Sequence, residues 1–429
     1  MVELIENKLK GKSIKNIFIK STIKQRMESL KINKIKKTVS GSIQITGSKS
    51  ETNRLLVLQQ FYPNLEIDNI SNSDDSRLMQ QALVNDSNEI NIGHAGTAMR
   101  FLTAYFSAKE NSEIILTGSH RMKNRPIKIL VDALMALGAN IQYLEKEGYP
   151  PLKISGKKLV NDFVEIDGNV SSQYITALLL IAPTLKKGLQ LKFKGKVTSV
   201  PYINMTLQLL VELGIKYSWE NNVISIQPKL RIENKKIVIE SDWSSASYYY
   251  SLCALSPNSE IILSSYKKNS LQGDSVLADI YKELGVETVF RSNTILLKNT
   301  KILNHKPLTL NLQNAPDIAQ TIAVTCFGLG IECFLSGLHT LKIKETDRLV
   351  ALKTEIEKLG GEVLITNETL HLKPSTKINE EICILTYDDH RMAMAFAPLA
   401  TRVLIQIEEA NVVSKSYPTF WEDFEKITS

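Results

Sequence analysis

Basic side chains recur beside small residues at several points of the sequence, in a pattern suited to binding anions. The first stretch is Gly47-Ser48-Lys49-Ser50, which leads into an apolar run that contains Arg54. Small residues before an apolar helical run indicate a helix N-terminus, where free N–H groups and the helix dipole favour an anion. We therefore predict an anion site at Lys49, Ser50 and Arg54. The G-x-x-x-x-G-K pattern of a P-loop is absent from this stretch.

Two further stretches of the first half combine helix starts with cations or small residues. Gly96 ends a glycine-rich turn before a helix, so backbone N–H groups there can approach a ligand closely. Arg121, Lys123 and Arg125 crowd three cations before a helix that we expect to start at Pro126. Such crowding opposes the helix dipole unless an anion neutralises it.

Neutral hydrogen-bonding groups stand at other helix starts. Ser171, Ser172 and Gln173 begin an apolar helix and offer hydroxyl and amide groups. Ser199 and Tyr202, on either side of Pro201, are further neutral donors.

The second half of the chain places carboxylates among cations. Asp317 follows a predicted strand, and Glu345 lies between Lys344 and Arg348. Arg391 begins an apolar helix, and Lys415 lies near the end of the chain. Arginine suits bidentate recognition of phosphate and carboxylate groups, and a carboxyl group can transfer protons. We infer a site for more than one phosphorylated or carboxylated small molecule, with two carboxylates placed for proton transfer.

The elements that must position these residues repeat along the chain. Amphipathic helical segments each end at a Leu-Gly pair, at Gly138, Gly214, Gly285 and Gly360, and lead into apolar strands. The glycines are 76, 71 and 75 residues apart. Short strand patterns lie between them at 43–45, 113–116, 189–193, 236–240, 261–263 and 308–310. This order predicts an α/β fold of repeated modules grouped into two lobes, with ligands in the cleft between them.

Charge and composition exclude other classes. Residues 1–40 carry 11 Lys/Arg against 3 Asp/Glu, whereas the remaining residues carry 41 against 42. The basic segment 1–26 therefore reads as a separate N-terminal extension, and the folded part lacks the positive surface that nucleic acid requires. No apolar run is long enough to span a membrane, and the four cysteines lie in apolar stretches without metal-ligand spacing. We expect a cytoplasmic protein that needs no metal.

The ordered set of motifs resembles the 3-phosphoshikimate 1-carboxyvinyltransferase family over nearly the whole chain, from about Met27 to Lys426. Each motif alone is weakly specific, whereas the full set in this order is highly specific. The motifs are GSKSxTNR, HAGTAMR, RxKxRP, SSQ, PYI, SDWSSAS, QGD, PD, KETDRL, DDHRMAM and a late lysine.

This resemblance implies the two-lobed enolpyruvyl-transferase fold, in which each lobe holds three βαβαββ units around a pseudo-threefold axis. Lobe 1 would comprise 27–47 and 241–429, lobe 2 would comprise 48–240, and the active site would lie between them. The implied reaction transfers the enolpyruvyl group of phosphoenolpyruvate to the 5-hydroxyl of shikimate 3-phosphate in chorismate and aromatic amino acid biosynthesis. It releases phosphate through a tetrahedral ketal, uses no cofactor, and is carried out in this family by a monomer.

The resemblance also implies residue roles. Asp317 would accept the proton of the attacking hydroxyl, Glu345 would protonate the methylene carbon and later help to deprotonate it, and Lys49 would also be catalytic. Shikimate 3-phosphate would be bound by Lys49, Ser50, Arg54, Ser171, Ser172, Gln173, Ser199, Asp317, Thr340 and Lys344. Phosphoenolpyruvate would be bound by Lys49, Gly96, Arg125, Gln173, Arg348, Arg391 and Lys415.

The sequence departs from the family pattern at three positions. His94 replaces a usual Asn, Phe101 replaces a frequent Pro after Arg100, and Thr340 replaces an Asn that contacts shikimate 3-phosphate. Gly96 and Thr97 match the glyphosate-sensitive class, so we expect glyphosate to compete with phosphoenolpyruvate.

Three alternatives remain in view. An enolpyruvyl transferase acting on UDP-N-acetylglucosamine would carry a Lys-Asn pair where Lys49-Ser50 stands, and often a cysteine acid that residues 100–125 lack. A nucleic-acid-binding or RNA-end-processing protein would share related βα repeats but would need a basic folded surface. A catalytically inactive binding protein is disfavoured because Lys49, Asp317, Glu345 and Arg391 are all present.

Overall fold

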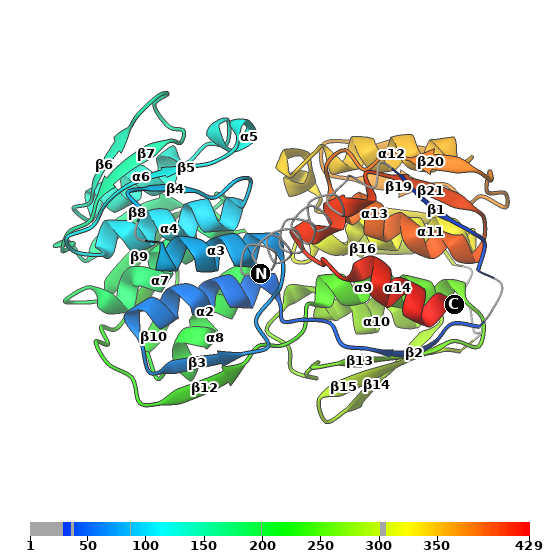
Figure 1. The fold of residues 1–429 in the computed structure, drawn as a ribbon, viewed down its shortest axis with the longest axis horizontal. Coiled ribbons are helices and arrows are strands. Elements are labelled where there is room, and N and C mark those ends of the chain that lie inside the picture. The colour runs from blue at the N-terminus through cyan, green and yellow to red at the C-terminus, as the bar shows by residue number, and fades with distance from the viewer. Residues whose placement is uncertain (1–28, 36–37, 86, 199, 301–305) are drawn as a thin grey trace, which may run out of the picture.

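Two lobes lie side by side, each with its own hydrophobic core (Figure 1). The computed structural model describes residues 29–35, 38–85, 87–198, 200–300 and 306–429. The predicted extension 1–26 and the candidate residue Ser199 lie outside these ranges. One core draws on residues from Leu55 to Ile239, and we call the lobe around it lobe 2. The other combines Val39, Ile43 and Ile45 with residues from Trp243 to Ile427, and it defines lobe 1. The finer boundaries, 27–47 with 241–429 and 48–240, stay a prediction.

Lobe 2 contains three small sheets with helices packed between them. Its strands form the orders β4-β5-β7-β6, β10-β11-β9-β8 and β12-β3. The strands are β3 (Leu65–Asp68), β4 (Glu89–Asn91), β5 (Glu113–Thr117), β6 (Asn140–Tyr143), β7 (Leu152–Ser155), β8 (Phe163–Asp167), β9 (Leu189–Lys194), β10 (Tyr217–Glu220), β11 (Val223–Ile226) and β12 (Lys235–Val238). The helices are α2 (Lys49–Phe61), α3 (Asp74–Val84), α4 (Gly96–Ala108), α5 (His120–Lys123), α6 (Lys128–Ala136), α7 (Ser172–Ile181), η1 (Ala182–Thr184) and α8 (Val200–Glu212).

Lobe 1 repeats this plan with the orders β14-β15-β13-β2, β16-β17-β19-β18 and β1-β21-β20. The strands are β1 (Ser29–Ile32), β2 (Ser40–Ile43), β13 (Glu260–Ser264), β14 (Val286–Arg291), β15 (Thr294–Asn299), β16 (Leu308–Asn311), β17 (Cys333–Ser336), β18 (Val363–Ile365), β19 (Leu370–Leu372), β20 (Ile382–Ile384) and β21 (Ile405–Glu408). The helices are α9 (Trp243–Leu255), η2 (Gly273–Val276), α10 (Leu277–Glu283), η3 (Pro316–Ile318), α11 (Ala319–Leu329), η4 (His339–Ile343), α12 (Arg348–Lys358), α13 (His390–Phe396), η5 (Ala397–Thr401), η6 (Ala410–Lys415) and α14 (Phe420–Thr428).

Each four-stranded sheet has the same internal pattern. A parallel pair comes first, such as β4 with β5 or β16 with β17, and two antiparallel pairings follow. In each sheet, the helix before the strand that is third in chain order is followed by one of the repeated glycines. Their φ angles are 104°, 73°, 79° and 95° at Gly138, Gly214, Gly285 and Gly360. These left-handed conformations are ones that glycine adopts without a steric penalty. The predicted modules are therefore confirmed.

The two segments that cross between the lobes pair with each other. Gly47 bridges Ser241, and Ser48 N donates to Glu240 O at 2.8 Å. The strand expected at 43–45 is wrong in its extent, because β2 ends at Ile43. The Ile45 carbonyl instead accepts a hydrogen bond from the Ser241 hydroxyl of the other crossing segment. These crossings fix the start of α2 against lobe 1.

Candidate active site

A cavity of about 310 Å³ opens between the lobes and is lined by residues from both. It brings together every candidate residue in the described part of the chain, whereas Ser199 is not described. Lobe 2 contributes Lys49, Ser50, Arg54, Gly96, Arg125, Ser171, Ser172 and Gln173. Lobe 1 contributes Asp317, Thr340, Lys344, Glu345, Arg348, Arg391 and Lys415. Side chains separated by up to 366 residues in the chain thus share one crevice.

The N-terminus of α2 forms one wall of the cavity, as the sequence predicts. Ser48 precedes the helix and Lys49 begins it, with the Lys49 ammonium 3.7 Å from Asp75 Oδ2. Arg54, one turn later, is buried, and its guanidinium donates to the Ser50 carbonyl at 2.6 Å and to Thr206 Oγ1 at 2.8 Å. Burial lowers the pKa of Arg54 to about 10. No carboxylate pairs with Arg54 among the described residues, so its charge is left for a ligand.

Two more helix starts face the same space. Ser171 caps α7, and Gln173 Nε2 donates to Thr97 Oγ1 at 3.2 Å, which ties α7 to the first turn of α4. At the start of α4, a Cβ atom on Gly96 would lie 2.4 Å from Arg125 Nη1. The Arg125 guanidinium therefore rests directly on the glycine, and within the described ranges no carboxylate pairs with it.

The expectation that Pro126 starts a helix is wrong. Helix α6 begins at Lys128, and Ile127 is its N-cap residue. The Pro126 carbonyl instead accepts hydrogen bonds from Arg100 Nη2 at 3.0 Å and from the Tyr174 hydroxyl at 2.6 Å. These contacts fix the segment that follows Arg125, which lines the cavity.

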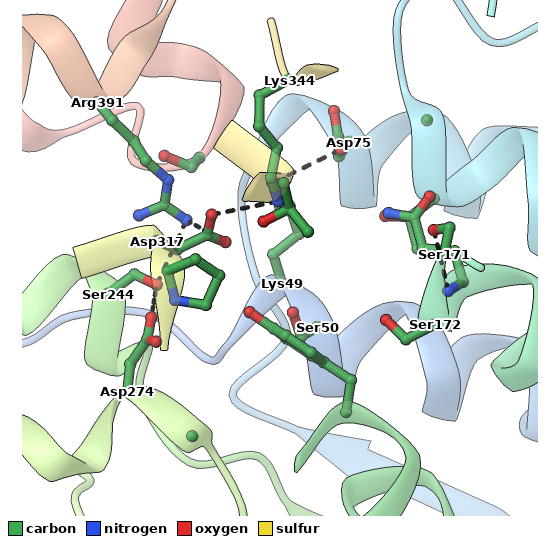
Figure 2. A pocket seen from close by; sticks show the side chains of 18 of the residues that line it. Lys49, Ser50, Asp75, Ser171, Ser172, Ser244, Asp274, Asp317, Lys344 and Arg391 are labelled. Atoms are coloured by element: carbon green, nitrogen blue, oxygen red, sulfur yellow. Dashed lines mark hydrogen bonds and ion pairs between the residues drawn. The ribbon is translucent and has the colours of Figure 1, made fainter. Parts of the chain in front are cut away.

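On the lobe 1 side, Asp317 lies at the centre of a group of cations. Figure 2 shows its carboxylate between Arg391 and Lys344. The ion-pair distances are 3.1 Å to Arg391, 3.3 Å to Lys344 and 3.0 Å to Arg348. Burial alone would raise the pKa of Asp317, but these cations hold it well below its usual range. Asp317 is therefore an ionised carboxylate that can accept a proton.

Glu345 and Arg348 form a second charged group beside the first. Glu345 pairs with Arg348 at 2.8 Å and with Lys415 at 2.5 Å. Arg348 is fully buried and also pairs with Asp389 at 2.7 Å. Burial opposes ionisation of Glu345, yet Arg348 and Lys415 hold its pKa well below the usual value. The cations that would bind an anionic ligand, Arg348 and Lys415, therefore form ion pairs with protein carboxylates.

Comparison with known proteins decides which family this arrangement belongs to. Residues 64–424 match the family model described as EPSP synthase (3-phosphoshikimate 1-carboxyvinyltransferase). A protein of Bacteroides fragilis named 3-phosphoshikimate 1-carboxyvinyltransferase is 44% identical over 393 residues, which covers 90% of this chain and 95% of the relative. One of the same name from Haemophilus influenzae is 35% identical over 424 residues, covering 91% and 96%. The chain belongs to the EPSP synthase family.

Solved structures agree with this family fold. The structure of EPSP synthase from Acinetobacter baumannii has a TM-score of 0.78 at 20% identity and covers 93% of this chain and 98% of that one. The enolpyruvyl transferase NikO from Streptomyces tendae has a TM-score of 0.72 at 13% identity, covering 93% and 97%. The predicted two-lobed enolpyruvyl-transferase fold is confirmed.

Several cavity residues escaped the sequence-based assignment within the EPSP synthase family motifs. Asp274, from the QGD motif, accepts a hydrogen bond from Ser244 of the SDWSSAS motif, and burial followed by the charge of Asp317 raises its pKa to about 7. Burial and then Arg391 lower the pKa of His390, which lines the cavity as a neutral ring. The buried Asp389 does not line the cavity but accepts hydrogen bonds from both Arg391 N and Arg348 Nε, two residues that do. These motifs were visible in the sequence, but only contacts reveal what each polar group faces.

The three departures from the EPSP synthase pattern all line the cavity. Phe101 is buried within the regular helix α4, and the Arg54 guanidinium lies 5.6 Å from its ring centroid. Thr340 Oγ1 is buried, with no hydrogen-bond partner among the described residues. His94 is exposed at the rim, where a second cavity of about 680 Å³ adjoins the first. The Gly96 helix therefore keeps its form with Phe101, and Thr340 retains an unused hydroxyl.

Within the described ranges, no cluster of His, Cys, Asp or Glu is arranged to hold a metal ion. Over the same residues, no helix has both the length and the apolarity to cross a membrane.

Proposed function

We propose that this chain transfers the enolpyruvyl group of phosphoenolpyruvate to the 5-hydroxyl of shikimate 3-phosphate and releases phosphate. Membership of the EPSP synthase family supports this activity, as does the shared name of relatives that match nine-tenths of the chain. The observation that carries it is the convergence of lysine and arginine side chains from both lobes on one cavity that also holds Asp317 and Glu345. That cavity suits two anionic substrates and proton transfer between them.

The two substrates share the cavity as neighbours. We assign shikimate 3-phosphate mainly to the helix starts of lobe 2 together with the lobe 1 edge, and phosphoenolpyruvate to a subsite that residues of both lobes form. Support comes from the uncompensated Arg54 charge beside hydroxyl donors on one side and the dense cations on the other. The residues proposed for shikimate 3-phosphate are Lys49, Ser50, Arg54, Ser171, Ser172, Gln173, Ser199, Asp317, Thr340 and Lys344. Those proposed for phosphoenolpyruvate are Lys49, Gly96, Arg125, Gln173, Arg348, Arg391 and Lys415.

The addition step needs a base and an acid at opposite ends of the forming bond. Asp317 takes the proton of the 5-hydroxyl as its oxygen attacks C2 of phosphoenolpyruvate, and the methylene carbon C3 gains a proton. The product is a tetrahedral ketal that carries a methyl group. In elimination the bond from C2 to the phosphate oxygen breaks, the methyl group loses one proton, and the C2–C3 double bond re-forms. Lys49 and the surrounding cations stabilise the negative charge on phosphate as it leaves.

The ionised state of Glu345 bears on its role as the acid. Its pKa is low because Arg348 and Lys415 pair with it. When the anionic groups of phosphoenolpyruvate pair with those same cations, Glu345 loses their support and its pKa rises. We therefore propose that Glu345 takes up a proton as phosphoenolpyruvate binds, delivers it to C3, and accepts a proton back during elimination.

The acceptor is tested by supplying two compounds of different chemistry. Phosphate release should require phosphoenolpyruvate together with shikimate 3-phosphate and should not occur with UDP-N-acetylglucosamine. Turnover with the UDP-sugar alone would favour a UDP-N-acetylglucosamine enolpyruvyl transferase. The fold does not separate the two activities, because another enolpyruvyl transferase, NikO, has a similar fold. We also propose that the enzyme works as a cytoplasmic monomer. The single-chain origin of every described site residue supports a monomer being sufficient for the reaction.

Replacing Arg125 should affect one substrate far more than the other. Arg125→Ala should raise the KM for phosphoenolpyruvate about 10- to 100-fold, as expected for losing a charge-assisted hydrogen bond of about 1.5–3 kcal/mol. The KM for shikimate 3-phosphate should change little. Lys123→Ala is the matched control, since Lys123 is a nearby cation that pairs with Glu145 at 2.5 Å and is absent from the cavity lining. Equal losses for both substrates would show that the two subsites are misassigned.

Glyphosate should inhibit this enzyme in competition with phosphoenolpyruvate. An added methyl group at Gly96 would meet the movable end of Arg125 at 2.4 Å, so Gly96→Ala should displace that guanidinium without disturbing the fold. We expect the variant to bind both glyphosate and phosphoenolpyruvate more weakly, by about tenfold or more, at unchanged melting temperature. Steady-state inhibition at several phosphoenolpyruvate concentrations tests this, and a non-competitive pattern in the wild type would contradict it.

A further inference from the structure

A single amide side chain ties the two lobes together where the chain crosses between them. Gln272 is buried at the cavity wall between β13 and η2. Its Nε2 donates to Glu51 Oε1 at 2.8 Å and to the Ser241 carbonyl at 3.0 Å, and its Oε1 accepts from Trp243 N at 2.9 Å. It therefore joins α2 of lobe 2, one crossing segment, and the first residue of α9 in lobe 1.

Glu51 occupies the first turn of α2, two residues after Lys49. The pattern Ser48-x-x-Glu51 is typical of a capping box, in which the glutamate would accept from the Ser48 backbone N–H. Here Ser48 N donates to Glu240 O instead, and the Glu51 carboxyl faces Gln272. Glu51 is only 3% exposed and takes part in no ion pair among the described residues. A buried carboxyl without a cationic partner is costly in its ionised form.

The negative charge of Glu240 acts on Glu51 in the same direction as burial. Glu240, on the neighbouring crossing segment, is also buried and accepts from Trp243 Nε1 at 2.8 Å and Ser270 Oγ at 2.6 Å. Burial, and then Glu240, raise the pKa of Glu51 to about 8, against smaller opposing effects of the Gln272 hydrogen bond, of Lys267 and of the Glu240 backbone. Arg54, farther along α2, also interacts with Glu51, and its positive charge opposes the rise. Glu51 is thus a neutral acid near pH 7.

We propose that Glu51 and Gln272 are a positioning pair that fixes the N-terminus of α2 against lobe 1 while adding no negative charge beside Lys49 and Ser50. This rests on the proposed function, which assigns those two residues to shikimate 3-phosphate. The positive end of the helix dipole and the Lys49 ammonium attract the substrate's anionic groups, and an ionised glutamate in the same turn would offset both. Neutral Glu51 keeps the hydrogen bond to Gln272 without that offset.

The pair predicts a pH dependence confined to one substrate. Above pH 8 Glu51 ionises beside Glu240, and the KM for shikimate 3-phosphate should rise about tenfold between pH 7 and pH 9.5. Glu51→Gln keeps the size and the acceptor oxygen but cannot ionise, so its KM should match the wild type at pH 7 and lack that rise. Gln272→Met should raise this KM at all pH values, with kcat and the KM for phosphoenolpyruvate changed much less. Glu355→Gln, a buried carboxyl on α12 away from the cavity, is the control.

Unfolding supplies a second readout that needs no substrate. Because the folded-state pKa of Glu51 lies above the unfolded value of 4.5, its protonation stabilises the fold at low pH, and this contribution is lost as pH rises through about 8. Urea unfolding should show the wild type losing stability relative to Glu51→Gln between these limits. If the wild type and Glu51→Gln gave the same dependence of KM on pH and parallel stability curves, the positioning pair would be overturned. Turnover by the wild type in the same experiment would still support the proposed reaction. Absence of wild-type turnover with both substrates would refute the proposed function itself.

Discussion

Glu345→Gln should lower kcat by about 10²- to 10⁴-fold, the usual contribution of a positioned general acid–base group. The amide keeps the size of the side chain but can neither deliver a proton to C3 nor take one back. It also carries no charge, so Arg348 and Lys415 lose a competing anion. The KM for phosphoenolpyruvate should therefore stay unchanged or fall. Steady-state kinetics with both substrates varied separate these effects.

Glu357 offers a matched control for Glu345→Gln. Glu357 lies on α12 and pairs with Lys353 at 2.5 Å outside the cavity, so Glu357→Gln should leave kcat near the wild-type value. If Glu345→Gln retained more than about a tenth of wild-type kcat, an acid–base role of Glu345 would be contradicted. A rise in KM for phosphoenolpyruvate at normal kcat would instead make Glu345 a residue that only orders its neighbours.

Arg348→Ala should lose both substrate binding and stability. The buried guanidinium pairs with Asp317, Glu345 and Asp389, so its removal leaves three carboxylates short of a partner. Breaking a buried ion pair by removing one member destabilises a protein by about 3–5 kcal/mol. Urea unfolding should show a loss of this size, and the KM for phosphoenolpyruvate should rise steeply. Arg125→Ala provides the contrast, because no described carboxylate depends on that residue.

The same network sets the response of stability to acid. The pKa values of Asp317 and Glu345 are depressed in the folded protein, so their contribution is complete above the unfolded values of 3.8 and 4.5 and is lost as pH falls below them. Arg348→Ala should weaken this acid-dependent loss, since a main cause of both depressed pKa values is gone. An unchanged acid limb, or a stability loss below about 1 kcal/mol, would show that Arg348 does not hold the group together.

The sequence was sufficient to predict the module plan and to name side chains that line one cavity. Leu-Gly pairs report a local requirement, a helix end with positive φ, which depends little on the rest of the fold. Helix starts at Lys49, Gly96 and Ser172 were likewise readable from small residues before apolar runs. The order of the motifs then predicted which of these helix N-termini lie close together in space, which a local pattern cannot determine.

The sequence was insufficient wherever a long-range contact decides the outcome. Pro126 does not begin a helix because Arg100 and Tyr174 bind its carbonyl oxygen. The carbonyl of Ile45, which was expected in a strand, accepts a hydrogen bond from Ser241 of the other crossing segment. Glu51 resembles a capping residue, yet Gln272, 221 residues away, is its partner. Asp274 and His390 acquire their shifted pKa values from burial, which no local pattern of charges reveals.

Solvent hydrogen in the product tests the addition–elimination chemistry most directly. In deuterium oxide, with phosphoenolpyruvate and shikimate 3-phosphate present, C3 gains a deuteron and the resulting methyl group then loses one of its three hydrogens. Mass spectrometry should therefore find deuterium in the vinylic methylene of the enol ether product, and none in phosphoenolpyruvate incubated without the acceptor. An enol ether formed without any deuterium would contradict protonation at C3, and with it the proposed role of Glu345.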